Sequence, residues 1–206
     1  METNWASDHL QTIRTLMERS ALYRRALAPI MTVSGVLGLI AAVASHFIRV
    51  ETDFWFAAFW LSVSLVGLGT ALLMVRRQAL KEAEPFWSLP TRRVTQALLP
   101  AFCVGLVAGG IHLFGSPSST AWLLAIVWIV AYGCALHAAG FFMQNRIKLF
   151  GWIFIVGGCG VLIASQSWPS FRTTEAAHFL MGGFFGLLHL ACGIFLYFTE
   201  KRGTNA

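Results

Sequence analysis

The sequence has few charged residues, and those few are confined to short segments. Only 12% of its 206 residues are charged, whereas a soluble domain carries about 25%. Five stretches hold no charged residue at all: 26–48, 54–75, 94–145, 149–171 and 176–199. A charge in hydrocarbon costs about 2.5–3.5 kcal/mol even on lenient insertion scales. Stretches free of charge and this apolar are therefore suited to lipid.

The lengths of these stretches predict six transmembrane helices. A helix needs about 20 residues to cross a bilayer. Four stretches fit one crossing each, and the longest fits two, separated by a turn at Gly115-Ser-Pro-Ser-Ser119. Barrel strands would be about 10 residues long with alternating polarity, which is not seen. We predict an all-α bundle of three hairpins with helices at 27–48, 54–75, 96–114, 121–143, 148–165 and 177–198, the second continuing toward Glu84.

The basic residues predict the orientation. With the N-terminus in the cytoplasm, all but two of the 15 basic residues lie on the cytoplasmic side, and the exceptions are Arg49 and Arg172. We therefore expect a multi-pass protein of the plasma membrane with both termini, including the tail 200–206, in the cytoplasm. No signal peptide is expected, because 25 residues of mixed charge precede the first apolar stretch. The net charge of +6 suits an anionic leaflet and requires no nucleic-acid partner.

Sequence motifs for common enzyme classes are missing. The chain has no CxxC pair, Walker loop, nucleophile elbow or HExxH motif. No acidic residue, lysine or arginine lies inside a predicted crossing, which disfavours proton-coupled carriers and voltage sensors. The four cysteines fall one on each of the last four helices, where they read as packing residues. We expect a protein without enzymatic activity.

The segment before the first crossing predicts an amphipathic helix. Over residues 5–25, Leu10, Ile13, Met17 and Ala21 fall on one stripe, and charged residues lie away from it. Such a helix can lie on the membrane surface or bind a cytoplasmic protein. It can equally cap this chain's own bundle.

Glycines at helical spacing predict close packing between helices. Small residues three or four positions apart let two backbones approach. The predicted packing positions are Gly105, Gly109, Gly133, Gly140, Gly182, Gly186 and Gly193. The contacts they make can lie within one chain or between copies.

Two intramembrane histidines are candidate axial ligands of a haem. His137 and His189 each stand on a glycine-lined stripe, where a flat porphyrin could lie against the backbone with the histidines as axial ligands of haem b. The alternative is that each histidine is hydrogen-bonded to a neighbouring helix, because an unsatisfied polar group in lipid costs several kcal/mol.

A second group of residues predicts a divalent-metal site near the non-cytoplasmic face. His46, His112, Glu175 and His178 are expected at a similar depth. Glu175 and His178 share one helix face at the i, i+3 spacing that recurs in carboxylate metal sites. Ordinary interfacial polar residues are the alternative interpretation.

Several strings resemble a group of uncharacterised bacterial six-helix integral membrane proteins. They are Ala-Tyr-Gly-Cys-Ala-Leu-His137-Ala-Ala-Gly, Ile147-Lys-Leu-Phe-Gly-Trp, and the run from His178-Phe-Leu-Met-Gly-Gly through His189 to Tyr197-Phe-Thr-Glu-Lys201. Genes for such proteins often lie near winged-helix regulators. The resemblance therefore implies the bacterial inner membrane and a sensory or regulatory role, and it carries over no catalytic residue.

Three functions compete on the sequence alone. The first is a non-enzymatic membrane module that self-associates or binds a partner through its glycine stripes and residues 5–25. The second is a b-type haem or metal-binding protein that uses the histidines. The third is a small uncoupled channel or carrier, whose only obvious polar lining is Thr32, Ser34, Ser62, Ser64 and Thr70.

Overall fold

A computed structural model describes residues 26–83, 85–115, 120–143 and 145–204. The amphipathic segment predicted at 5–25 lies outside these residues. Within the described part all regular structure is helical, and six helices are long and apolar enough to cross a membrane. The predicted all-α class with six helices long and apolar enough to span a membrane is confirmed. These spans are Ala26–Phe47, Asp53–Lys81, Thr91–Phe114, Ala121–Ala139, Asn145–Ser167 and Thr174–Thr199.

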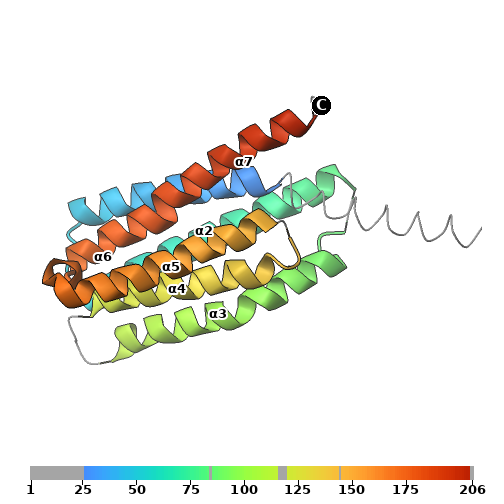
Figure 1. Ribbon diagram of the computed structural model, residues 1–206. Coiled ribbons are helices and arrows are strands. Elements are labelled where there is room, and N and C mark those ends of the chain that lie inside the picture. Colours follow the sequence, from blue (N-terminus) through green and yellow to red (C-terminus); the bar gives the residue numbers. More distant parts are fainter. Residues whose placement is uncertain (1–25, 84, 116–119, 144, 205–206) are drawn as a thin grey trace, which may run out of the picture.

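The helices follow one another in antiparallel order along one axis (Figure 1). After the first helix, Ala26–Phe47, come α2 (Asp53–Lys81), α3 (Leu89–Phe114), α4 (Ala121–Ala139) and α5 (Asn145–Ser167). A short 3-10 turn, η1 (Pro169–Arg172), leads into the last helix. That helix has three parts: α6 (Thr174–Met181), the π-helical η2 (Gly182–Leu188) and α7 (His189–Thr204).

The chain order divides the bundle into two ends of different charge. At the basic end α2 stops, α3 begins, α4 turns into α5, and α7 terminates. This end carries Arg76, Arg77, Lys81, Arg92, Arg93, Arg146 and Lys148. The opposite end carries Arg49 and Arg172 with Glu51, Asp53 and Glu175. The charge asymmetry predicted from the sequence is therefore a property of the two ends of the folded bundle.

Helix limits at the basic end differ from those expected. Helix α3 begins at Leu89 rather than near 96, with Pro90 in its first turn, and Pro100 consequently lies inside the helix rather than near its start. The hydrophobic run marks the part in lipid, whereas a helix can continue past the hydrocarbon into the charged interface. Helix α4 ends at Ala139 instead of 143, so that the α4–α5 connection is a tight turn.

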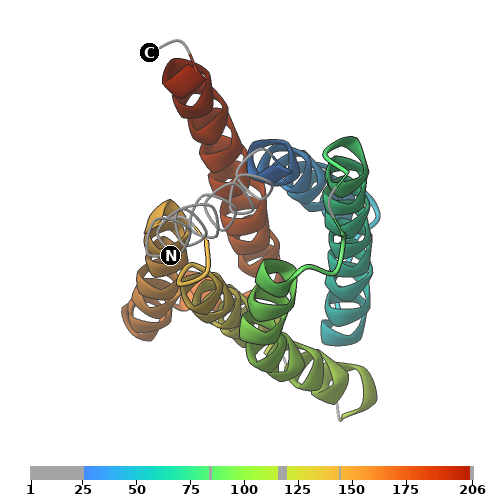
Figure 2. The same ribbon diagram turned by 90° about the vertical axis from the view of Figure 1, so that its right-hand side faces the viewer.

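Helix α4 occupies the centre of the bundle. It packs between α3 and α5 and also contacts α6 (Figure 2). Half of its crossing, 50%, is buried inside the chain, against only 6% for α2 and 6% for α3. Helix α4 is therefore the most buried of the six helices, whereas few residues of α2 and α3 are fully buried.

The glycine stripe of the last helix packs against the first helix of the same chain. A Cβ placed on Gly186 would lie 2.9 Å from the Leu39 side chain and 3.0 Å from the Leu39 amide nitrogen. One on Gly182 would lie 2.6 Å from the Ala42 Cβ, and Gly193 faces Thr32 as closely. These distances are too short for any side chain, so the glycines are needed for this helix pair.

The first helix contributes its own glycines to the same contact. A Cβ on Gly38 would lie 2.5 Å from the carbonyl oxygen of Phe185, and Gly35 faces the backbone of Leu190. The two helices thus meet backbone to backbone, with η2 at the centre of the contact. Gly35 and Gly38 are not among the packing glycines predicted from the sequence.

The remaining predicted glycines also contact helices within the chain. A Cβ on Gly133 of α4 would lie 2.8 Å from the Gly151 carbonyl oxygen of α5, and Gly140 faces Lys148. Gly105 and Gly109 of α3 lie beneath Trp128 of α4. The glycine stripes are therefore occupied within one copy of the chain.

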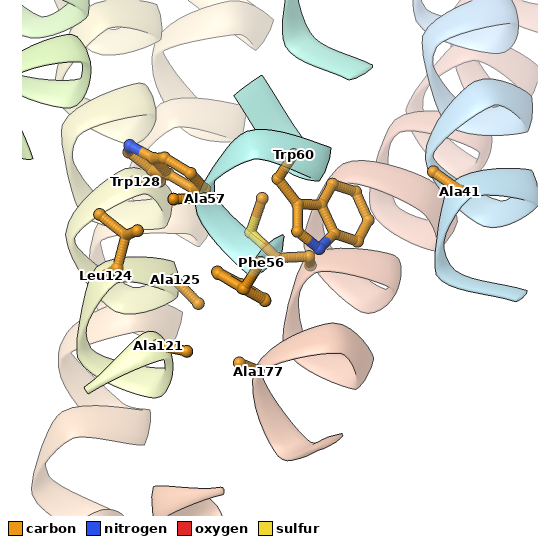
Figure 3. Close-up of a cluster of buried hydrophobic side chains, with 10 residues drawn as sticks. Ala41, Phe56, Ala57, Trp60, Ala121, Leu124, Ala125, Trp128 and Ala177 are labelled. Atoms are coloured by element: carbon orange, nitrogen blue, oxygen red, sulfur yellow. The ribbon is translucent and has the colours of Figure 1, made fainter. Parts of the chain in front are cut away.

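An aromatic cluster near the acidic end fixes α2 to the bundle. Phe56 and Trp60 of α2 are buried between α4 and α6, as Figure 3 shows. The Phe56 ring stacks on Trp128 of α4 with centroids 6.1 Å apart, and Ala177 of α6 is fully buried beside them. Large aromatic rings bury much apolar surface, so this cluster holds the first turns of α2 in place.

Candidate functional site

His189 is the most deeply buried histidine among the described residues. It begins α7 directly after the π-helical η2, and it is only 2% exposed. Its Nδ1 lies 3.1 Å from the carbonyl oxygen of Phe184, five residues earlier. A π-helical turn is wider than an α-helical one, which places that carbonyl within reach of the imidazole. Since a carbonyl only accepts, Nδ1 carries the proton.

The second ring nitrogen of His189 is also satisfied. The Tyr132 hydroxyl of α4 lies 2.8 Å from Nε2 and donates to it, because the proton of the imidazole is on Nδ1. Phe150, Phe154 and Phe185 surround the imidazole at ring-centroid distances of 5.3, 5.5 and 5.9 Å. The result is a closed Tyr–His hydrogen bond in an aromatic environment, joining α4 to the last helix.

His178 is held in the same way near the acidic end. The indole Nε1–H of Trp60 donates to His178 Nδ1 at 3.0 Å, and His178 Nε2–H donates to the Val50 carbonyl oxygen at 3.0 Å. The imidazole is therefore neutral, with one tautomer selected by its partners. It links α6, α2 and the loop that precedes α2.

A third polar group joins the N-terminal ends of α2 and α4. Both carboxylate oxygens of Asp53 accept backbone N–H groups, from Thr120 at 2.8 Å and from Ala121 at 3.2 Å. His112 of α3 donates from Nδ1 to the Ala108 carbonyl oxygen at 3.0 Å, and its Nε2 lies 3.1 Å from the Thr120 hydroxyl. Asp53 thus caps α4 from another helix. Its negative charge lies at the N-terminus of α4, where it interacts favourably with the positive end of the helix dipole.

The predicted haem ligands are not brought together. His137 packs edge-on against Phe141 and Trp152, at centroid distances of 5.4 and 5.3 Å, whereas His189 packs among a different set of rings. Both nitrogens of His189 are hydrogen-bonded, so the imidazole has no lone pair free for iron. The side chains at this site do not fit a haem between α4 and the last helix.

Two of the four predicted metal ligands are committed to hydrogen bonds, and the other two are exposed. His178 and His112 use both ring nitrogens for hydrogen bonds, and His46 and Glu175 are exposed. Over the described ranges, no group of three His, Cys, Asp or Glu residues could hold a metal ion. Glu175 instead lies in the first turn of α6, whose N-cap is Thr173, and His178 is bonded to Trp60 and Val50.

Four of the five hydroxyl groups proposed as a pore lining are satisfied by their own helices. Thr32 donates to Ala28, Ser62 to Ala58, and Thr70 to Val66, each to the carbonyl oxygen four residues earlier. Ser64 donates to the Leu61 carbonyl oxygen in the same manner. A hydroxyl bonded back to its own backbone can face lipid at low cost.

Sequence reasoning missed the partners rather than the buried polar residues themselves. Trp60 reads as one of many aromatics in an apolar stretch, and Asp53 reads only as the charge that bounds a crossing. Tyr132 is one more aromatic residue in an apolar stretch, and nothing in its local pattern assigns it to His189, 57 positions away. No local pattern connects Trp60 to His178, since 118 positions separate them.

Comparison with known proteins adds no family to this description. No protein-family model, no curated protein and no solved structure matches the chain.

Proposed function

We propose that this chain is a non-enzymatic module of the bacterial inner membrane that self-associates through the outer faces of α2 and α3. The observation that carries the proposal is the uneven burial of the crossings. In α2 and in α3 only 6% of the apolar window is buried inside the chain, against 28% to 50% in the other four. Few side chains of these two neighbouring helices are therefore fully enclosed by the chain, and each helix keeps an outer face open to whatever surrounds the bundle.

The composition of this surface supports association with another helix rather than with lipid alone. Ser62, Ser64 and Thr70 of α2 lie on it with their hydroxyls bonded to their own backbone. A Cβ on Gly69 of α2 or on Gly110 of α3 would meet nothing within 4 Å. Small residues and hydroxyls are the side chains that let two helices approach in a membrane, where apolar burial alone provides no driving force.

The internal polar groups support a structural rather than a catalytic role. Imidazoles and carboxylates that catalyse reactions need a free lone pair or proton facing a substrate. His178 and His189 instead use both nitrogens for bonds between helices, and Asp53 is committed to capping α4. These groups tie the bundle together.

Self-association is tested by energy transfer between donor-labelled and acceptor-labelled copies in liposomes at decreasing protein-to-lipid ratio. We expect transfer that falls on dilution along a dimerisation curve, and that is weakened by Gly69→Leu and Gly110→Leu. The matched control is Gly160→Leu on α5, where a Cβ also meets nothing within 4 Å. Transfer no greater than random proximity predicts, or equal effects of all three variants, would overturn the proposal.

The proposed orientation places the basic end in the cytoplasm, with both termini on that side. Reporter fusions after Gln78 and after Gly203 should report the cytoplasm, and one after Pro117 the periplasm. A periplasmic signal at Gln78 would refute this orientation without bearing on self-association.

A further inference from the structure

Four side chains form a compact cluster where α4 turns into α5 at the basic end. His137 and Phe141 come from the end of α4 and its turn, and Lys148 and Trp152 come from the start of α5. Each pair is four residues apart. The Lys148 ammonium lies 4.7 Å from the centroid of Phe141, and the His137 ring contacts both Phe141 and Trp152.

Three N–H-bearing groups in this cluster have no acceptor among the residues that the structure describes. Among the described residues, Lys148 forms no ion pair, and its ammonium contacts only an aromatic ring. The Trp152 indole likewise makes no hydrogen bond to a described residue. His137 Nδ1 is buried with no hydrogen-bond partner. This lack of partners sets His137 apart from His112, His178 and His189, whose ring nitrogens are all bonded.

The unpartnered Nδ1 indicates where the His137 proton lies. A buried N–H without an acceptor is rarer in proteins than a buried acceptor without a donor. The proton is therefore on Nε2, which is not enclosed in the same way. The cluster consequently offers three donors, an ammonium, an imidazole N–H and an indole N–H, and its one acceptor, the unprotonated His137 Nδ1, is buried away from them.

The position of the cluster indicates what kind of acceptor it meets. Trp152 and Phe141 are 49% and 66% exposed, as expected for aromatic anchors at a membrane interface. Basic residues of α2, α3 and α5 share this end, with Arg146 two residues before Lys148. Lipid phosphates lie at this depth, and clusters of this kind between helices on the cytoplasmic side bind anionic headgroups.

We infer that His137, Lys148 and Trp152 form a binding site for the phosphate of an anionic phospholipid, with Phe141 and Trp152 against the glycerol and upper acyl chain. The site depends on the proposed orientation of the basic end and is independent of self-association. Lys148 supplies the charge, and the two ring N–H groups donate to phosphate oxygens.

The site is tested by the thermal unfolding midpoint of the full chain in a neutral detergent, with phosphatidylglycerol or phosphatidylcholine added in increasing amounts. A ligand that binds only the folded state raises this midpoint in proportion to its occupancy. We expect phosphatidylglycerol to raise the midpoint in a saturable manner and phosphatidylcholine to have a much smaller effect. Lys148→Gln and Trp152→Phe should each weaken the apparent affinity about tenfold, the loss expected for one strong hydrogen bond.

The control variant is Arg76→Gln, which removes the same charge from an exposed position of α2 at the same end. It should keep the wild-type affinity. Trp152→Phe keeps an aromatic side chain at the position while removing the indole N–H. Equal losses in Arg76→Gln and Lys148→Gln would show attraction to the whole basic end and would overturn the site. Full stabilisation by inorganic phosphate without lipid would overturn the lipid as the ligand, as would an unchanged affinity in both site variants.

Discussion

The contact between the first and last helices allows a sharp test with a pair of glycines in one segment. Gly186 and Gly183 both belong to η2, but only Gly186 faces the first helix. A leucine at 186 would place its Cβ 2.9 Å from the Leu39 side chain, whereas a Cβ at 183 meets nothing within 4 Å. The two substitutions add the same side chain to the same helical segment, so that intrinsic helix preference cancels in their comparison.

The expected difference follows from the distances. Ordinary contact needs about 3.5–4.0 Å between carbons, so the helices must separate by several tenths of an ångström for the Cβ alone and further for the rest of the leucine. Overpacking of this kind costs about 1–3 kcal/mol. Separation would also loosen the backbone contacts of Gly35, Gly38 and Gly193, which raises the expected difference to about 2–4 kcal/mol. For a chain of this size that corresponds to about 5–15 °C in unfolding midpoint.

The measurement is thermal unfolding in detergent at high dilution, followed by intrinsic tryptophan fluorescence. Gly186→Leu should unfold well below the wild type, and Gly183→Leu close to it. Gly69→Leu on the exposed face of α2 should also remain close to the wild type, because its Cβ meets no neighbour. Similar midpoints for the 186 and 183 variants would refute the close helix contact.

Three further predictions concern the polar links between helices. Tyr132→Phe removes the hydroxyl that donates to His189 Nε2, so we expect a loss of about 1–3 kcal/mol; in a double-mutant cycle with His189→Leu, an additive double variant would contradict the bond. Trp60→Phe leaves His178 Nδ1 without its donor, and chemical unfolding should show a loss of about 1–3 kcal/mol; the control Trp55→Phe, at a residue 61% exposed, should change little. Asp53→Asn removes a charge from the N-terminus of α4, and we expect about 0.5–2 kcal/mol of destabilisation that shrinks as salt is added. A destabilisation no larger than that caused by Glu51→Gln would argue against the cap.

The histidines illustrate how far residue patterns lead. The intramembrane histidines can be recognised in the sequence, and a histidine in lipid needs either a ligand or a hydrogen-bond partner. That requirement is chemical and holds in any fold. The choice between the two depended on which helix faces which, and the structure places Tyr132 at His189 and Trp60 at His178.

The glycine stripes likewise reveal a packing face in the sequence but not the helix that packs against it. Spacing alone marks a helix face as suited to close approach, because the period of a helix is fixed. It does not say whether the approaching backbone comes from the same chain. The structure fills the stripe of Gly182, Gly186 and Gly193 with the first helix, and so moves the proposed association surface to α2 and α3.

The sequence by itself determined the six apolar helices and the basic and acidic ends, because the cost of charge in lipid and the length of a crossing act on each segment separately. Only the tertiary structure decided the central place of α4, the backbone contact through Gly38, the cap from Asp53 to α4, and the cluster of His137, Lys148 and Trp152. These depend on the rotation and neighbours of each helix. Lipid leaves those choices open, since an apolar face packs almost as well against acyl chains as against another helix.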